Sequence, residues 1–228
     1  MNRYNIRKRG FRIRLSVVSW IIAVSVVFSI MGLILFNLNQ EFLDYFALKP
    51  DNILNGKYIW TLITHIFFHG GLLHLFVNMV ALFSLGRLCE KIIGRKRFLW
   101  FYLLAGIFAG LLSVFLAGFF GAGGFEKIFG SPEVYMVGAS GAIFGVAGLF
   151  VILLPRLRFT IIFFPFFSLP AYIMVPLILI LTWAVTIAQG LNIGNVAHLG
   201  GFLAGIGYGY YLKLKYRKKV MMIQRYLR

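Results

Sequence analysis

Six apolar runs of about twenty residues constrain this chain more than any other feature of its sequence. They cover residues 16–37, 72–88, 98–118, 138–154, 169–188 and 196–213. A helix of about twenty apolar residues crosses the roughly 30 Å hydrocarbon core of a bilayer, and a composition of 61% hydrophobic and 13% charged residues is unlike that of soluble domains. The sequence therefore predicts an all-α, polytopic membrane protein, with six transmembrane helices in one domain of residues 16–213.

The distribution of basic residues predicts how the helices are oriented. All of the 23 Lys and Arg residues except Lys49, Lys57 and Lys127 lie before the first run, between the last residues of the second run and the start of the third, after the fourth run, or from the end of the sixth run onward. Positive residues favour the cytoplasmic side. We therefore expect both termini to be cytoplasmic, with residues 1–15 as a basic N-terminus and residues 214–228 as a basic tail.

The net charge of +17 does not by itself indicate a nucleic-acid partner. The basic clusters are divided among several loops, and they lack the interleaved aromatic residues of a nucleic-acid platform. They are better explained as topology signals that also meet the anionic lipids of the bilayer. We expect the lipid bilayer as a partner and no nucleic acid.

Two connecting segments do not fit simple membrane spans. Residues 38–71 form a long outer connection that is interrupted by Pro50 and Gly56, so we expect no single helix there. Residues 159–170 contain Pro165 and Pro170, which also discourage one continuous helix. Both segments are apolar enough to lie at the membrane interface.

Four polar side chains within the apolar runs define the candidate functional layer. Ser140 opens the fourth run, His74 and Asn78 lie in the first turns of the second, and His198 lies near the start of the sixth. Under the expected topology, these three runs all enter from the outer face, so the four side chains share one depth. Polar groups inside a membrane are expensive and mark function until a partner explains them.

The chemistry of these residues allows more than one interpretation. Ser140 lies between small residues that let helices approach, but His198 could act as the base that makes a serine nucleophilic. No carboxylate shares their layer, so the site is either a Ser–His dyad or not a hydrolase. Glu90 lies at the opposite end, where we expect a structural role, paired with Lys91, Arg87 or a loop donor.

His74 and Asn78 are four residues apart, on one face of a helix. Both can donate hydrogen bonds, so they could stabilise an oxyanion together with the Ser140 N–H, or they could simply tie helices together. The competing chemistry is a metal site formed by His65, His69, His74 and His198. Because no carboxylate or thiol shares their layer, we expect no metal.

Three ordered motifs resemble the rhomboid family of intramembrane serine proteases: HLFVN at 74–78, GASGAIFG at 138–145 and AHLGGFLAG at 197–205. The resemblance covers the chain from the first run to the sixth and implies a six-helix bundle of rhomboid type. It implies Ser140 as nucleophile and His198 as general base, with His74, Asn78 and the Ser140 N–H as the oxyanion site. Gly201 and Gly205 match a G-x-x-x-G motif that would press the sixth helix against the fourth.

The resemblance implies hydrolysis of peptide bonds in or near transmembrane segments of protein substrates, through an acyl-enzyme and without a cofactor. It implies a multi-pass protein, which we expect in the plasma membrane. Two positions depart from the family pattern: Trp60-Thr61 replaces the usual Trp-Arg pair, and Phe144 stands where tyrosine is common. The alternative is a catalytically inactive rhomboid-like chaperone that binds transmembrane segments.

Overall fold

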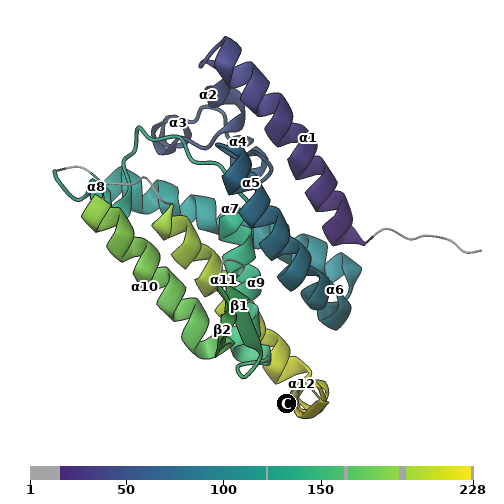
Figure 1. Ribbon diagram of the computed structural model, residues 1–228. Helices are drawn as coiled ribbons and strands as arrows, with labels where there is room; N and C mark the ends of the chain where they lie inside the picture. The colour runs from purple at the N-terminus through teal and green to yellow at the C-terminus, as the bar shows by residue number, and fades with distance from the viewer. Residues whose placement is uncertain (1–15, 122, 162–163, 190–193, 227–228) are drawn as a thin grey trace, which may run out of the picture.

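The computed structural model describes residues 16–121, 123–161, 164–189 and 194–226, so the expected N-terminal segment 1–15 lies outside the described residues. The described chain is mostly helical, as Figure 1 shows. Its elements are α1 (Val17–Leu38), α2 (Phe42–Phe46), α3 (Pro50–Leu54), α4 (Thr61–Thr64), α5 (Leu72–Ala81), the π-helical turn η1 (Leu82–Gly86), α6 (Arg87–Ile93), α7 (Arg95–Phe120), α8 (Glu126–Phe129), α9 (Ser140–Leu153), β1 (Arg158–Ile161), β2 (Phe164–Pro170), α10 (Ala171–Gln189), α11 (Asn195–Lys215) and α12 (Arg217–Tyr226).

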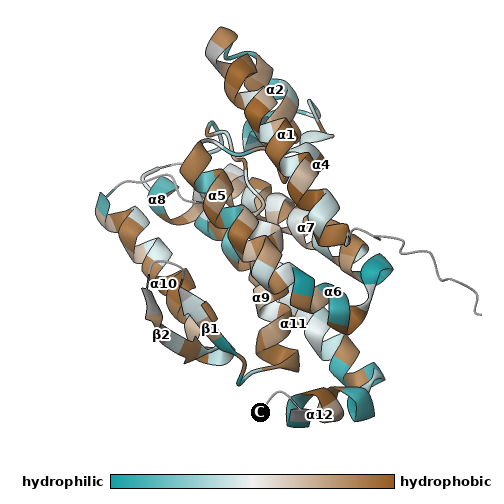
Figure 2. Ribbon diagram, turned by 45° about the vertical axis from the view of Figure 1, so that its right-hand side comes forward, coloured by the Kyte–Doolittle hydropathy of each residue, from teal (hydrophilic) through white to brown (hydrophobic). Residues whose placement is uncertain are grey.

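Within the described residues, four helical stretches are long and apolar enough to cross a membrane: Val17–Phe36, Leu72–Ile93, Arg95–Phe120 and Ala171–Gln189. Helix α9 is also apolar but has only 14 residues, and α11 has 21 residues with two lysines in its last turn. Large apolar side chains such as Trp20, Trp100 and Ile180 are more than half exposed, and Figure 2 shows that hydrophobic residues are frequent along the long helices. Together with the apolar composition, these features identify an integral, polytopic membrane protein.

The helices form a bundle in which α9 and α11 are central. Helix α11 packs most extensively against α9 and then against α7. In Figures 1 and 2, α1 lies on the side of α5 and α6, and α10 lies on the opposite side of the bundle. The short helix α12 lies across one end of the bundle.

The expectation of an all-α protein needs one correction. Strands β1 and β2 form an antiparallel hairpin between α9 and α10, with Arg158 opposite Pro170 and Thr160 opposite Ser168. Arg158 also donates hydrogen bonds from its guanidinium to the hydroxyl and carbonyl oxygens of Ser168. The prolines do exclude a long helix here, as predicted, and the β-branched and aromatic residues of the segment 159–170 favour extended backbone instead.

The ends of the second and sixth helices lie beyond those expected. The second span continues to Ile93, beyond the predicted end at residue 88, and stops where Gly94 adopts a φ of 87°. The sixth helix reaches Lys215, and the expected basic tail at 214–228 contains a helix, α12. This helix is held by packing of Val220 in the core and by a hydrogen bond of 2.9 Å from the Gln224 amide to the Leu153 carbonyl at the end of α9.

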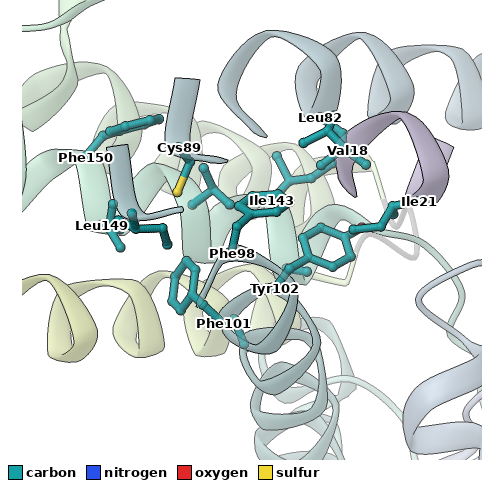
Figure 3. Packing of buried hydrophobic residues seen from close by; sticks show 14 of the residues in the cluster. Val18, Ile21, Leu82, Cys89, Phe98, Phe101, Tyr102, Ile143, Leu149 and Phe150 are labelled. Carbon is teal, nitrogen blue, oxygen red and sulfur yellow. The ribbon is translucent and has the colours of Figure 1, made fainter. Parts of the chain in front are cut away.

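The hydrophobic core lies where α1, α5 to α7 and α9 meet, as Figure 3 shows. Phe98, Tyr102 and Phe150 are fully buried there, and Cys89 is a buried packing residue. Glu90 lies beside this core with a structural role, but its partners are not Lys91 or Arg87. Its two carboxylate oxygens accept hydrogen bonds of 3.0 Å from the N–H groups of Val17 and Val18 at the start of α1, and it pairs with Arg95. The free N–H groups at a helix start are suitable donors for an acid.

The outer segment, residues 38–71, contains three short helices, α2 to α4, so the prediction that it is not one helix is confirmed. Its position is fixed by polar contacts to the loop before α9. The Asp44 carboxylate accepts hydrogen bonds of 2.7 Å from Asn52 and from the Tyr135 hydroxyl. Leu48 and Met136 form a two-hydrogen-bond antiparallel bridge. The outer segment therefore supports the chain that leads into Ser140.

Candidate active site

The four polar residues singled out in the sequence line one cavity of about 870 Å³. Ser140, His198, His74 and Asn78 contribute to its wall from α9, α11 and α5. Other parts of the wall come from α7, α8, α10 and the loop at 130–138. A largely apolar cavity with a few convergent polar groups is the usual form of an active or binding site.

Ser140 and His198 form the central contact of the site. Ser140 is the first residue of α9, and His198 lies in the first turn of α11. The His198 Nε2 atom lies 2.9 Å from the Ser140 Oγ atom, which is hydrogen-bond distance. His198 is buried, with 8% of its surface exposed. An imidazole acceptor at this distance can remove the serine proton.

Glycines bring these two helices close enough for the contact. A side-chain Cβ at Gly201 would overlap the carbonyl oxygen of Gly141, and one at Gly205 would overlap that of Gly145. A Cβ at Gly148 of α9 would likewise overlap the carbonyl oxygen of Phe202. The two backbones are therefore in direct contact along α9 and α11, as small residues permit in membrane helices.

The His198 ring is held by stacking instead of by a carboxylate. The Phe144 ring is stacked on it, with ring centroids 4.5 Å apart and planes 25° apart. The His198 Nδ1 atom is buried and has no hydrogen-bond acceptor among the described residues. The departure from tyrosine to phenylalanine at this position keeps the stacking surface and removes only a hydroxyl group.

The loop before Ser140 is held in an extended form by the outer segment. The Gly138 N–H donates to the His65 carbonyl at 2.8 Å, two residues after the bridge between Leu48 and Met136. Gly138 has a φ of 131°, which other residues rarely adopt. This conformation explains why the helix begins at Ser140 and not at the predicted residue 138.

His69 supports the same loop through a relay of hydrogen bonds that sequence reasoning did not find. The Ser29 hydroxyl lies 3.1 Å from the Phe67 carbonyl, to which it donates, and 3.0 Å from His69 Nδ1. The Ala139 N–H donates to His69 Nε2 at 3.3 Å. The only tautomer that satisfies all three contacts has the His69 proton on Nδ1, where it is donated to Ser29.

The protonation state of His69 agrees with this arrangement. Burial, and then the nearby His74, lower the pKa of His69 to about 3. His69 is therefore neutral near pH 7, so its Nε2 atom can accept a hydrogen bond from Ala139, the residue that precedes Ser140.

His74 and Asn78 lie in the cavity wall on α5. The His74 ring is packed close to Gly138, since a Cβ at Gly138 would be 2.9 Å from its Nε2 atom and 3.8 Å from Ser140 Oγ. Asn78 is buried and donates one amide hydrogen to the His74 carbonyl at 2.8 Å. Its second amide hydrogen remains for another acceptor. Helix α5 thus presents donors on the Ser140 side of the cavity.

The four histidines have separate hydrogen-bond partners, although the rings of His69 and His74 are in edge contact, with centroids 5.1 Å apart. His65 Nδ1 contacts the Thr61 carbonyl at 2.7 Å, His69 is engaged by Ser29 and Ala139, and His198 contacts Ser140. Within the described residues, no group of three His, Cys, Asp or Glu side chains is placed to hold a metal ion.

The second departure from the family pattern lies in the outer segment. Trp60 donates from its indole N–H to the Tyr45 carbonyl at 2.9 Å, and buried Thr61 donates to the Tyr58 carbonyl at 2.7 Å. These bonds are local to the outer segment. A threonine therefore stands where the family pattern has a long cationic side chain, and its hydroxyl group finds a hydrogen-bond acceptor within its own turn.

Comparisons with known proteins agree with the motifs. The family model described as "Rhomboid domain" matches residues 56–215. The chain is 32% identical over 169 residues to "Rhomboid protease GluP" of Bacillus subtilis, covering 73% of this chain and 29% of that protein. It is 31% identical over 156 residues to "RHOMBOID-like protein 5" of Arabidopsis thaliana, covering 68% and 45%.

A third relative is matched over more of its length. "Rhomboid-like protease 3" of Toxoplasma gondii is 25% identical over 220 residues, covering 92% of this chain and 72% of that protein. The chain spans less than half the length of the first two relatives.

Proposed function

This chain belongs to the rhomboid family, and on that premise we propose that it is an intramembrane serine endopeptidase that cleaves peptide bonds in or near transmembrane segments of membrane proteins. Family membership supports a protease-type function within the bilayer. The observation that carries the more specific proposal is the 2.9 Å contact between Ser140 Oγ and His198 Nε2 inside a cavity of a membrane protein.

The proposed reaction begins with a proton transfer from Ser140 Oγ to His198 Nε2 as the oxygen attacks the scissile carbonyl carbon. The tetrahedral intermediate collapses to an acyl-enzyme, and His198 gives its proton to the leaving amine. A water molecule then attacks the ester, with His198 again accepting a proton. When this second intermediate collapses, His198 returns that proton to the Ser140 Oγ atom, and the acid product leaves. Ser140 and His198 suffice for these proton transfers. A third catalytic residue would accept a hydrogen bond from His198 Nδ1, and this atom has no partner among the described residues.

The negative oxygen of the intermediate needs hydrogen-bond donors that are already in place. The Ser140 N–H is at the first position of α9, where a helix offers N–H groups without an intrahelical acceptor. We assign His74 and the free amide hydrogen of Asn78 as the side-chain donors, because both line the cavity beside Ser140. We also assign a positioning role to His69: by accepting the Ala139 N–H, it holds the residue before Ser140 and so keeps the Ser140 N–H in position.

The proposed topology places the dyad near the outer face. In it, α1, the α5 to α6 stretch, α7, α9, α10 and α11 are six spans of residues 16–213, and both termini with their basic residues are cytoplasmic. Water then reaches Ser140 from outside. A substrate helix hides its carbonyls in hydrogen bonds, so a segment with poor helical structure near the outer face is the expected target. The plasma membrane is the proposed location.

Labelling with a serine-reactive fluorophosphonate tests the proposal and separates it from an inactive chaperone of the same fold. We expect purified protein to be labelled and to cleave a reporter transmembrane substrate, with both signals lost in Ser140→Ala and the cleavage lost in His198→Ala. Ser113→Ala is the matched control, because Ser113 lines the same cavity but donates to the Ala109 carbonyl at 3.0 Å. Cleavage that persists in Ser140→Ala, or labelling that moves to Ser113, would refute the assignment.

A further inference from the structure

Three cationic side chains gather around one tyrosine where α11 meets α12. Helix α11 ends at Lys215, and Tyr216 separates it from α12. The Arg97 guanidinium lies 5.2 Å from the centre of the Tyr216 ring and donates to its hydroxyl at 3.0 Å. The Nζ atoms of Lys215 and Lys219 lie 5.8 Å and 5.9 Å from the same ring centre. We call Arg97, Lys215, Lys219 and Tyr216 the Tyr216 cluster.

The positive charge of this cluster is not balanced by acidic residues. Among the described residues, none of its three cations forms an ion pair. The one acid at this end of the described bundle is Glu90, and its oxygens are already used by Val17, Val18 and Arg95. Because all three cations lie within 6 Å of the centre of the same ring, their like charges repel one another, and the arrangement favours a bound anion.

The cluster lies beside apolar and aromatic surface. Lys215 donates to the Tyr211 hydroxyl at 2.7 Å, and the Tyr211 ring is stacked with that of Tyr208, which is stacked in turn on Phe101. Tyrosines in this arrangement are typical of the boundary between hydrocarbon and headgroups. Close to the cluster along the chain, Leu214 is 80% exposed and Met222 is 69% exposed. The acyl chains of a bound lipid would shield these apolar side chains from water, which is favourable.

We propose that the Tyr216 cluster binds the phosphate headgroup of an anionic phospholipid. The Arg97 guanidinium can offer paired N–H donors to phosphate oxygens, and the two ammonium groups add charge. The apolar surroundings and the integral membrane location favour a lipid over free phosphate as the source of the anion. This site is distinct from the Ser140 cavity, and it does not depend on proteolytic activity.

Native mass spectrometry of the full chain tests the proposal. The protein is purified with equal amounts of phosphatidylglycerol and phosphatidylcholine of identical acyl chains, and retained lipids are counted. We expect phosphatidylglycerol to be retained preferentially, and we expect Arg97→Gln, Lys215→Gln and Lys219→Gln each to weaken its retention about fivefold, as for one basic residue near an anionic membrane surface. The three side chains are exposed, so these variants are expected to fold.

Lys213→Gln and Lys218→Gln are the matched controls. They remove the same charge from exposed positions on α11 and α12 outside the cluster, and we expect less than a twofold effect. Equal losses in all five variants would indicate diffuse attraction and overturn the site, as would equal retention of the two lipids. Displacement of phosphatidylglycerol by an equal concentration of inorganic phosphate would show a free-phosphate site instead and refute the assignment to lipid. A thermal unfolding midpoint measured without added lipid separates loss of binding from loss of fold.

Discussion

Replacing Gly205 by alanine should slow cleavage by separating α9 from α11, although the residue is remote from the proposed dyad. A Cβ at this position would overlap the Gly145 carbonyl oxygen and lie 2.9 Å from its carbonyl carbon and 2.8 Å from the Leu149 nitrogen. Non-bonded carbon atoms prefer about 3.5 to 4.0 Å. The two helices must therefore move apart by about 1 Å, and a displacement of about 1 Å at a catalytic pair can reduce the rate about 100-fold.

Gly207→Ala is the matched control for this prediction. Gly207 lies on the same helix, but a Cβ there would meet no atom within 4 Å. Both substitutions add the same methyl group and the same gain in helix propensity of about 1 kcal/mol. We therefore expect Gly207→Ala to retain wild-type cleavage and at least wild-type thermal stability, and Gly205→Ala to lose most of its activity.

The assay combines three measurements on each variant: the initial rate of cleavage of a fluorogenic transmembrane substrate, the rate of fluorophosphonate labelling, and the thermal unfolding midpoint. Displacement of His198 from Ser140 should reduce the labelling rate as well as the cleavage rate. If Gly205→Ala cleaves and unfolds like the wild type, then contact between the two helices does not control the geometry of the dyad, and the reasoning fails.

Three further predictions concern the support of the site. His74→Ala and Asn78→Ala should each lower the cleavage rate by up to about 100- to 1,000-fold without changing the unfolding midpoint, because each removes one oxyanion donor. Wild-type cleavage rates at limiting substrate would show that both residues serve only in helix packing. Glu90→Ala should lower the unfolding midpoint by several degrees, because the substitution leaves two N–H groups at the start of α1 without their acceptor. An unchanged midpoint would contradict this structural role of Glu90. The pKa of His69 is lowered to about 3 in the folded protein, against about 6.5 in the unfolded chain. Below pH 6.5 the unfolded chain therefore binds a proton at His69 that the folded protein does not, and the free energy of unfolding should fall as the pH drops. The fall should be shallower in His69→Gln, which keeps an acceptor but does not titrate, and equal slopes in thermal unfolding between pH 7 and 5 would argue against this role.

The sequence by itself determined the class of the protein and the residues worth examining. Bilayer thickness sets the length of an apolar helix, so runs of about twenty apolar residues identify membrane helices without reference to packing. Ser140 and His198 stood out because polar side chains in apolar runs need a reason. The order of the three motifs was sufficient to indicate the rhomboid family, which the family model and the relatives then showed.

The tertiary structure alone decided which groups hold those residues in place. Ser29, His69 and Ala139 form a relay across 110 positions of sequence, and no spacing rule links a serine in α1 to the start of α9. The partners of Glu90, the hairpin at 158–170 and the cations around Tyr216 were equally invisible in the sequence. The physical reason is that hydrogen bonds and ion pairs depend on distances of about 3 to 4 Å, and between residues far apart in the chain those distances are set only by how the helices pack.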